Sequence, residues 1–298
     1  MNGSNGHLVV VVVVAVLVQI VGGCRSATSG VQNNANQPEQ NSSAQVQPNQ
    51  DPATTPLDKG DLKLRYNPRK NANAAGHKVG TDPKALEKLI ADLNNRLILP
   101  FDLYLSFEDC ELPDAFYDPD THQITICYQL IDEFYELFSR DSKNKGRIDD
   151  AVRNATAATF FHELGHALID VWQLPATGRE EDAVDQLSTL VLIQGAEEGA
   201  QMALDGAMSF KLTAELFKGE TKQYWDEHSL DEQRFYDTIC LIYGHDDQKY
   251  DYLVTNGILP EERAIYCAED YLKVNKAWGQ LMRPYLKSHQ PRPKMKFK

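Results

Sequence analysis

The stretch TFFHELGHALIDVW, residues 159–172, restricts the fold of this chain more than any other part of its sequence. His162 and His166 are four residues apart, so on a helix their imidazoles lie one above the other on the same face. The HExxH pattern is typical of a helix that holds zinc between the two histidines, with the intervening glutamate as general base. The stretch therefore predicts a rigid helix with His162 and His166 as metal ligands and Glu163 as the catalytic base.

A catalytic zinc ion needs a third protein ligand and one open position for water. GREEDAVDQLSTL, residues 178–190, begins a second predicted helix and offers Glu181 as that ligand. Asp185 follows four residues later on the same helical face, where it is placed to accept the free N–H of a ligating imidazole. Glu180 and Asp182 are expected to be solvated acids that the positive end of the helix dipole favours.

Hydrophobic periodicity predicts an α+β fold, in which a small N-terminal sheet is followed by a mostly helical body. Turn signals at Pro113 and at Asp118-Pro119-Asp120 separate the predicted strands. The strands are expected within 99–110 and 123–128, and the helices within 82–97, 149–172, 179–194, 195–218, 229–243, 246–256 and 260–285.

The N-terminal region is typical of an exported protein. Residues 8–21 are apolar but too short to span a bilayer comfortably, as in an export signal. They end in Val21-Gly22-Gly23-Cys24, which resembles the lipobox of bacterial lipoproteins, in which the cysteine is lipidated. The alternative is an ordinary cleaved signal followed by a chance cysteine. We therefore expect a lipid-anchored protein of the bacterial cell envelope that faces the periplasm.

Composition, together with this interpretation of the N-terminus, divides the chain into four predicted segments. Residues 1–23 form a lipoprotein-type signal peptide, and residues 24–60, rich in Gln, Asn, Ser and Pro, form a disordered tether. Residues 61–285 contain enough apolar side chains for one folded domain, and residues 286–298 form a basic tail. The formal net charge of -13 argues against nucleic acid as a partner.

Four cysteines remain once Cys24 is assigned to a lipid. None belongs to a CxxC pair, so a zinc or redox function is not indicated. In an exported protein they are expected to form two disulfides. Sequence alone allows three connectivities, of which we favour the local pairs Cys110–Cys127 and Cys240–Cys267.

The combination of HELGH and GREEDAVDQL resembles a bacterial family described as putative metallopeptidases, within the gluzincin group that includes thermolysin. The resemblance extends over about residues 85–285 and includes AFYDP, ITICY, EHSLDEQRFYDTICLIYG and LPEERAIYC. It implies a zincin-like metalloprotease fold in which the HExxH helix is part of the helical body. It also implies a zinc-dependent hydrolase, without indicating a substrate.

Asp114-Ala115-Phe116 resembles the Asn-Ala-Phe segment with which gluzincins bind the substrate backbone as an added strand. The resemblance assigns substrate-backbone binding to Asp114 and Ala115, although Asp114 replaces an asparagine and lacks its amide donor. The alternative is a simple turn that enters a strand.

His228 and Arg234, six residues apart, resemble a pair found downstream of the zinc motif in CaaX-type prenyl endopeptidases. That resemblance implies that His228 stabilises the oxyanion of the tetrahedral intermediate and that Arg234 orients ligand groups. The alternative is that His228 precedes a helix whose N-cap is Ser229.

The leading hypothesis is a cell-envelope zinc peptidase that acts on peptides or proteins. The alternative is a zincin-fold binding or scaffold lipoprotein with structural zinc and no turnover. A third hypothesis, a structural lipoprotein whose histidines are ordinary helix residues, predicts no metal at all. The oligomeric state cannot be predicted from the sequence.

Overall fold

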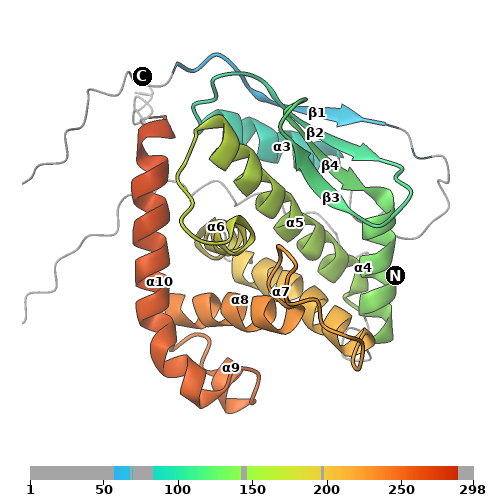
Figure 1. The fold of residues 1–298 in the computed structure, drawn as a ribbon, viewed down its shortest axis with the longest axis vertical. Coiled ribbons are helices and arrows are strands. Elements are labelled where there is room, and N and C mark those ends of the chain that lie inside the picture. Colours follow the sequence, from blue (N-terminus) through green and yellow to red (C-terminus); the bar gives the residue numbers. More distant parts are fainter. Residues whose placement is uncertain (1–56, 68, 70–82, 142–145, 196–197, 288–298) are drawn as a thin grey trace, which may run out of the picture.

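The computed structural model describes residues 57–67, 69, 83–141, 146–195 and 198–287 (Figure 1). The predicted signal peptide, the predicted lipidation site Cys24, most of the predicted tether and most of the predicted tail lie outside these residues. Among the helices that are described, none combines the length and apolar character needed to cross a bilayer.

A sheet with the strand order β1-β2-β4-β3 forms the N-terminal part of the fold. β1 (Leu62–Tyr66), β2 (Leu103–Glu108) and β4 (Gln123–Cys127) are parallel, and β3 (Ala115–Asp118) runs antiparallel to β4 at one edge. The strands predicted within 99–110 and 123–128 are confirmed as β2 and β4. β1 and β3 were not predicted, because each is short and lies beside a polar segment or between turn signals.

The helical body follows the sheet, so the predicted α+β class is confirmed. Its helices are α3 (Pro83–Asn94), which precedes β2, and then α4 (Tyr128–Arg140), α5 (Ile148–Val171), α6 (Glu180–Gly195), α7 (Gly199–Leu216), α8 (Asp231–His245), α9 (Tyr252–Thr255) and α10 (Glu261–Met282). A short 3₁₀ turn, Arg283–Tyr285, follows α10.

The predicted helix 246–256 is wrong over most of its length, since only α9 is helical. Asp246 follows α8 in a non-helical conformation, and its carboxylate accepts a hydrogen bond from the backbone N–H of Lys249 at 3.0 Å. Such side-chain bonds to the backbone favour a turn over a continued helix.

α5 is the central helix, with β3 and β4 on one side and α6 and α7 on the other (Figure 1). Two close contacts fix α6 against it. Gly165 of α5 has no side chain, and a Cβ there would lie only 2.8 Å from the Cβ of Val184. Ser188 of α6 donates a hydrogen bond to the carbonyl oxygen of Ala158 at 2.8 Å. The crossing of α5 and α6 is therefore close and well defined.

Both predicted disulfides are confirmed. Cys110–Cys127 joins the segment after β2 to the end of β4, and Cys240–Cys267 joins α8 to α10. Backbone hydrogen bonds also tie residues at both ends to the body, from Lys59 N–H to the Leu99 oxygen at 2.8 Å and from Lys287 N–H to the Arg96 oxygen at 2.7 Å.

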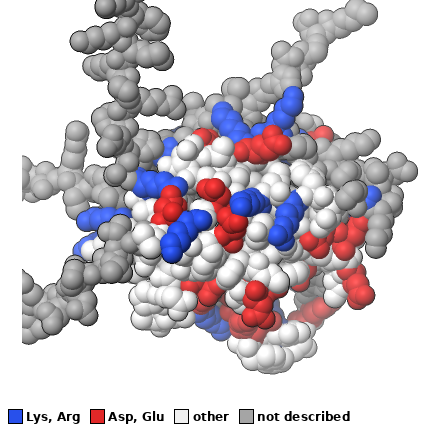
Figure 2. Space-filling model, turned by 90° about the horizontal axis from the view of Figure 1, so that it is seen from above, with Lys and Arg blue, Asp and Glu red and all other residues white. Residues whose placement is uncertain are grey.

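Charged side chains on the face seen in Figure 2 include both signs, with Lys and Arg interspersed among Asp and Glu. The described residues on this face form no continuous basic patch of the kind that binds nucleic acid.

Candidate metal centre and active site

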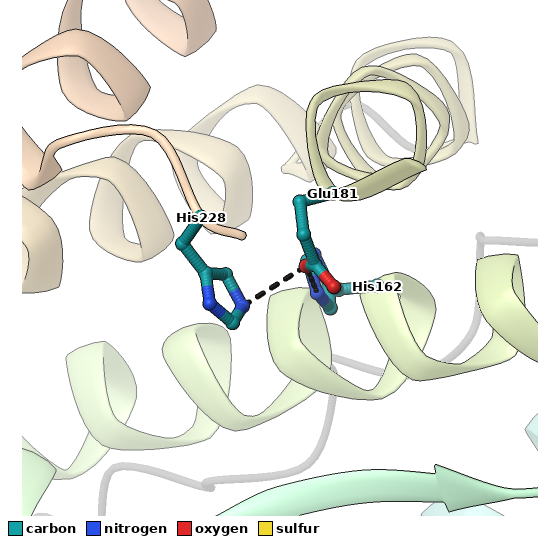
Figure 3. A group of neighbouring side chains, drawn as sticks. All are labelled: His162, Glu181 and His228. Carbon is teal, nitrogen blue, oxygen red and sulfur yellow. Dashed lines mark ion pairs between the residues drawn. The ribbon is translucent and has the colours of Figure 1, made fainter. Parts of the chain in front are cut away.

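Side chains from α5, from the first turn of α6 and from the loop before α8 converge on one point (Figure 3). His162, Glu181 and His228 each offer a ligand atom, and these atoms lie within 4.8 Å of one another. His166 lies one helical turn after His162, and its Nε2 is 3.3 Å from the Nε2 of His162. The three ligands predicted from the sequence are thus together, and His228 is beside them.

Glu181 bridges the imidazoles with its two carboxylate oxygens. Oε1 lies 3.3 Å from His166 Nε2, and Oε2 lies 3.1 Å from His162 Nε2 and 2.9 Å from His228 Nε2. Although Oε2 is buried and has these short contacts, it accepts no hydrogen bond of acceptable geometry. Burying a carboxylate oxygen without a hydrogen-bond donor costs free energy unless a cation neutralises the charge.

The other ring nitrogens of His162 and His166, the Nδ1 atoms, each lie against a carboxylate. His162 Nδ1 lies 2.7 Å from Asp185 Oδ1, and His166 Nδ1 lies 2.8 Å from Glu180 Oε1. An ionised carboxylate only accepts, so each Nδ1 carries the hydrogen and a neutral imidazole presents its lone pair at Nε2. The Nε2 atoms of both histidines and the Glu181 carboxylate therefore face the same point, where each deprotonated Nε2 offers a lone pair to a metal.

The distances fit a tetrahedral ion. Ligand atoms about 2.0–2.1 Å from a tetrahedral zinc lie about 3.3–3.4 Å from one another. The contacts among His162, His166 and Glu181 span 3.1 to 3.3 Å, with Oε2 of Glu181 beside His162 and Oε1 beside His166. Two imidazoles and one carboxylate are also a common donor set of catalytic zinc, so the residues present fit such an ion.

The electrostatics of the cluster favour positive charge. Burial alone would lower the pKa of His162, but the adjacent carboxylates of Asp185 and Glu181 raise that pKa to about 9. Burial would raise the pKa of Glu181, but the surrounding histidines hold it far below the usual carboxyl range. Protons on the imidazoles thus take the place of a cation in the metal-free protein.

Asp185 is held in turn by Arg234, as two nearly parallel hydrogen bonds show. Arg234 Nε donates to Oδ2 at 2.7 Å and Nη2 donates to Oδ1 at 2.8 Å. Burial would raise the pKa of Asp185, but the hydrogen bonds from Arg234 and His162 lower it to about 2. The guanidinium also stacks on Phe210, 4.0 Å from the ring centre. Arg234 therefore contacts Asp185 and orients His162 only through it.

The first turn of α6 also fixes the loop that carries His228. Arg179 Nη1 donates to the carbonyl oxygens of Asp226 and His228, at 3.1 and 2.9 Å. Ser229 donates its hydroxyl to Asp182 at 2.6 Å. Ser229 is consequently not the N-cap of α8, a position that Leu230 occupies. Asp182 thus binds the loop that carries His228, and the prediction that it is only a solvated acid is wrong.

The expectation for Glu180 is wrong in the same way, since it binds His166 instead of only facing solvent. Nothing in the local pattern distinguishes it from other acids at a helix start. The α5–α6 crossing, which periodicity does not specify, decides which carboxylate meets which imidazole.

Asp170, four residues after His166, accepts a hydrogen bond from the Tyr117 hydroxyl at 2.8 Å.

Glu163 is buried, with 6% of its surface exposed, and lines two cavities that meet at the cluster. Burial raises the pKa of its carboxyl group. The larger cavity, about 690 Å³, which we call the outer cleft, is also lined by Asp114, Ala115, His166 and Glu181. Asp114 and Ala115 thus lie at the start of edge strand β3 and beside the cluster.

The comparison with known families decides the class of the protein. Residues 66–282 match a family model described as "Putative metallopeptidase". The chain belongs to this family. Membership makes it a peptide hydrolase that works with a metal, and the His162, Glu181 and His228 group fits a metal. No curated protein and no solved structure matches the chain.

Proposed function

We propose that the protein is a zinc-dependent metallopeptidase of the bacterial cell envelope, with Glu163 as general base. The observation that carries the proposal is the convergence of the Nε2 atoms of two histidines and the Glu181 carboxylate beside a buried glutamate. The donor set of His162, His166 and Glu181 favours zinc, since zinc accepts imidazole and carboxylate in tetrahedral geometry. The order of edge strand, HExxH helix and glutamate helix supports a zincin-like fold.

Bound Zn²⁺ would supply a water of lowered pKa and a Lewis acid for the scissile carbonyl. Glu163 accepts the proton of the attacking water and delivers it to the leaving amine. Its burial excludes bulk water and keeps the carboxylate in place between attack and departure. Asp185 and Glu180 hold the two histidines as Nδ1–H tautomers, so their Nε2 atoms remain available as ligands.

His228 has a different role in this proposal. Its side chain is 41% exposed and comes from a loop, whereas those of His162 and His166 are 10% and 16% exposed and belong to one rigid helix. A hydrogen-bond donor at the open side of a metal site is placed to stabilise negative charge on the substrate oxygen. We therefore assign His228 to the oxyanion and not to the resting ligand set.

The substrate backbone is proposed to lie along β3. This strand pairs with β4 on one side and is the edge of the sheet, and Asp114 and Ala115 line the outer cleft at its start. An extended peptide added to such an edge gains main-chain hydrogen bonds without sequence restriction.

The location belongs to the proposal as well. The lipobox-like Cys24 and the apolar segment before it favour a lipid anchor, and two disulfides are typical of exported proteins. A tether rich in Gln, Asn, Ser and Pro would let the domain work at a distance from the membrane.

A Glu163→Gln variant tests the general base. We expect it to bind zinc as the parent does and to lose at least 100-fold in kcat/KM on a mixed peptide library, because the base is absent. Glu87→Gln, an exposed residue on α3, is the matched control and should cleave normally. Equal cleavage by the Glu163→Gln variant would show that Glu163 is not the base. Zinc binding without turnover by the parent would favour the binding-module alternative.

A further inference from the structure

A second cavity leads inward from the metal cluster, between the helices of the body. It has a volume of about 230 Å³ and shares His162, Glu163 and His228 with the outer cleft. We call it the inner cavity. Because it opens at the catalytic glutamate, a side chain next to the scissile bond of a bound peptide can enter it.

Much of the wall of the inner cavity is apolar and built from small residues. Ala155 and Ala158 of α5 face Ala203, Gly206 and Ala207 of α7. The two helices approach closely, since a Cβ on Gly206 would lie 2.7 Å from the Cβ of Ala158. The wall thus suits the methylene groups of a long side chain.

Several carboxylates that line this cavity form no ion pair within the described part of the chain. Glu133 of α4 and Asp231 of α8 are both half-buried, and no residue in the described part of the chain forms an ion pair with either. Asp185 and Arg234, which also line the cavity, neutralise each other. Burial raises the pKa of the Glu133 and Asp231 carboxyl groups, and the positive charge of Arg234 offsets this only in part at Asp231.

Local structure explains only one of these acids. Asp231 lies in the first turn of α8, where the helix dipole favours negative charge. Glu133 lies inside α4, where neither helix end can stabilise it. A cation brought into the cavity by the substrate would favour the charged form of these acids, whereas an aliphatic side chain would bury them further without a partner.

We propose that the inner cavity binds a lysine or arginine side chain of the substrate, with its methylenes along α5 and α7 and its cationic group in the part of the cavity that acids such as Glu133 and Asp231 line. This inference rests on the proposed peptidase function and names its substrate class. The outer cleft agrees with it. Asp114, Asp170 and Glu227 line that cleft, and no lysine or arginine is among its described lining residues. The negative electrostatic potential of such a cleft attracts cationic peptides.

The test is peptide binding to the Glu163→Gln variant, which should bind substrate without cleaving it. The probes are alanine-rich decapeptides that carry one lysine, arginine, norleucine or glutamate at the same position, with that position moved along the peptide. We expect the lysine and arginine peptides to bind at least tenfold more tightly than the norleucine peptide in at least one register, and the glutamate peptide to bind most weakly.

Additional substitutions of the acids locate the effect. Glu133→Gln and Asp231→Asn should each reduce the lysine preference while leaving norleucine binding within twofold, and Glu133→Lys should reverse the preference towards glutamate. Glu136→Gln, an exposed acid on the same helix outside the inner cavity, is the matched control. If Asp231→Asn fails to fold, the Glu133 variants decide alone.

Equal affinity for the lysine and norleucine peptides in every register would overturn the inference, as would a preference unchanged by both substitutions. The proposed function fails separately. A parent protein that binds the lysine peptides selectively but cleaves none of them keeps the inner-cavity assignment and loses the peptidase mechanism.

Discussion

At the scale of single residues, carboxylates organise the centre more than the histidines do. Glu181 faces the imidazoles, and Asp185 and Glu180 hold the far nitrogens of His162 and His166. Arg234 then fixes Asp185. Each imidazole is thereby restricted to one tautomer and one orientation before a metal arrives. Such preorganisation raises ligand basicity and lowers the entropic cost of binding the ion.

Asp185→Asn tests this arrangement. The amide keeps the shape but removes the charge that holds the His162 Nδ1–H, so zinc affinity should fall by about 10–100-fold. Asp170→Asn is the matched control, because Asp170 is also on the helix side of the outer cleft but bonds to Tyr117. Competition against a chromogenic chelator measures both. Equal zinc affinity in the parent and the Asp185→Asn variant would show that Asp185 does not support zinc binding by His162.

Metal binding should release protons. Because the pKa of His162 is raised to about 9 without metal, this ligand is protonated at neutral pH and must lose its proton to bind zinc. Affinity should therefore rise as pH increases towards 9, with at least about one proton released per ion near pH 7. Calorimetric titration in buffers of different ionisation enthalpy counts these protons. Binding that releases none would contradict the geometry of His162 with Asp185 and Glu181.

At the scale of elements, the crossing of α5 and α6 brings the two sequence motifs together. The helices that carry HELGH and GREED could be predicted from their periodicity, and so could Glu181 and Asp185 from their spacing. The close contact at Gly165 and the Ser188 hydrogen bond could not. Pairings across helices depend on which faces meet, so Glu180 with His166 and Arg179 with the His228 loop emerged only from the structure.

Gly165→Ala tests that crossing. The new Cβ would lie 2.8 Å from the Val184 side chain, which is β-branched and close to its own backbone, so α6 must shift. We expect a loss of about 1–3 kcal/mol in the free energy of unfolding. Zinc binding should weaken as well, because Glu181 is one turn before Val184. Chemical denaturation and chelator competition measure the two effects.

A second substitution provides the control for this prediction. Val184→Ala removes the clashing Cγ1 but keeps the Cβ, so the double variant Gly165→Ala with Val184→Ala should recover part of the zinc affinity that Gly165→Ala loses. Zinc affinity that is unchanged in Gly165→Ala would show that the α5–α6 distance does not control the site.

At the scale of the whole molecule, a small sheet and a helical body enclose a centre that opens to two cavities. The α+β class and both disulfides could be predicted, because they follow from local periodicity and from the spacing of cysteines. The two short strands β1 and β3 could not, because four or five residues beside turns or polar segments carry too little pattern. The cavities and the unpaired acids Glu133 and Asp231 arise only from the packing of α4, α5, α7 and α8.

The most direct test of the central claim is the metal content of the purified protein, measured by elemental analysis beside His162→Ala and Glu163→Gln variants. The account predicts about one zinc per chain in the parent and in Glu163→Gln, and almost none in His162→Ala. A correctly folded parent that takes up no metal after incubation with zinc would contradict it, and HELGH would then be an ordinary buried helix.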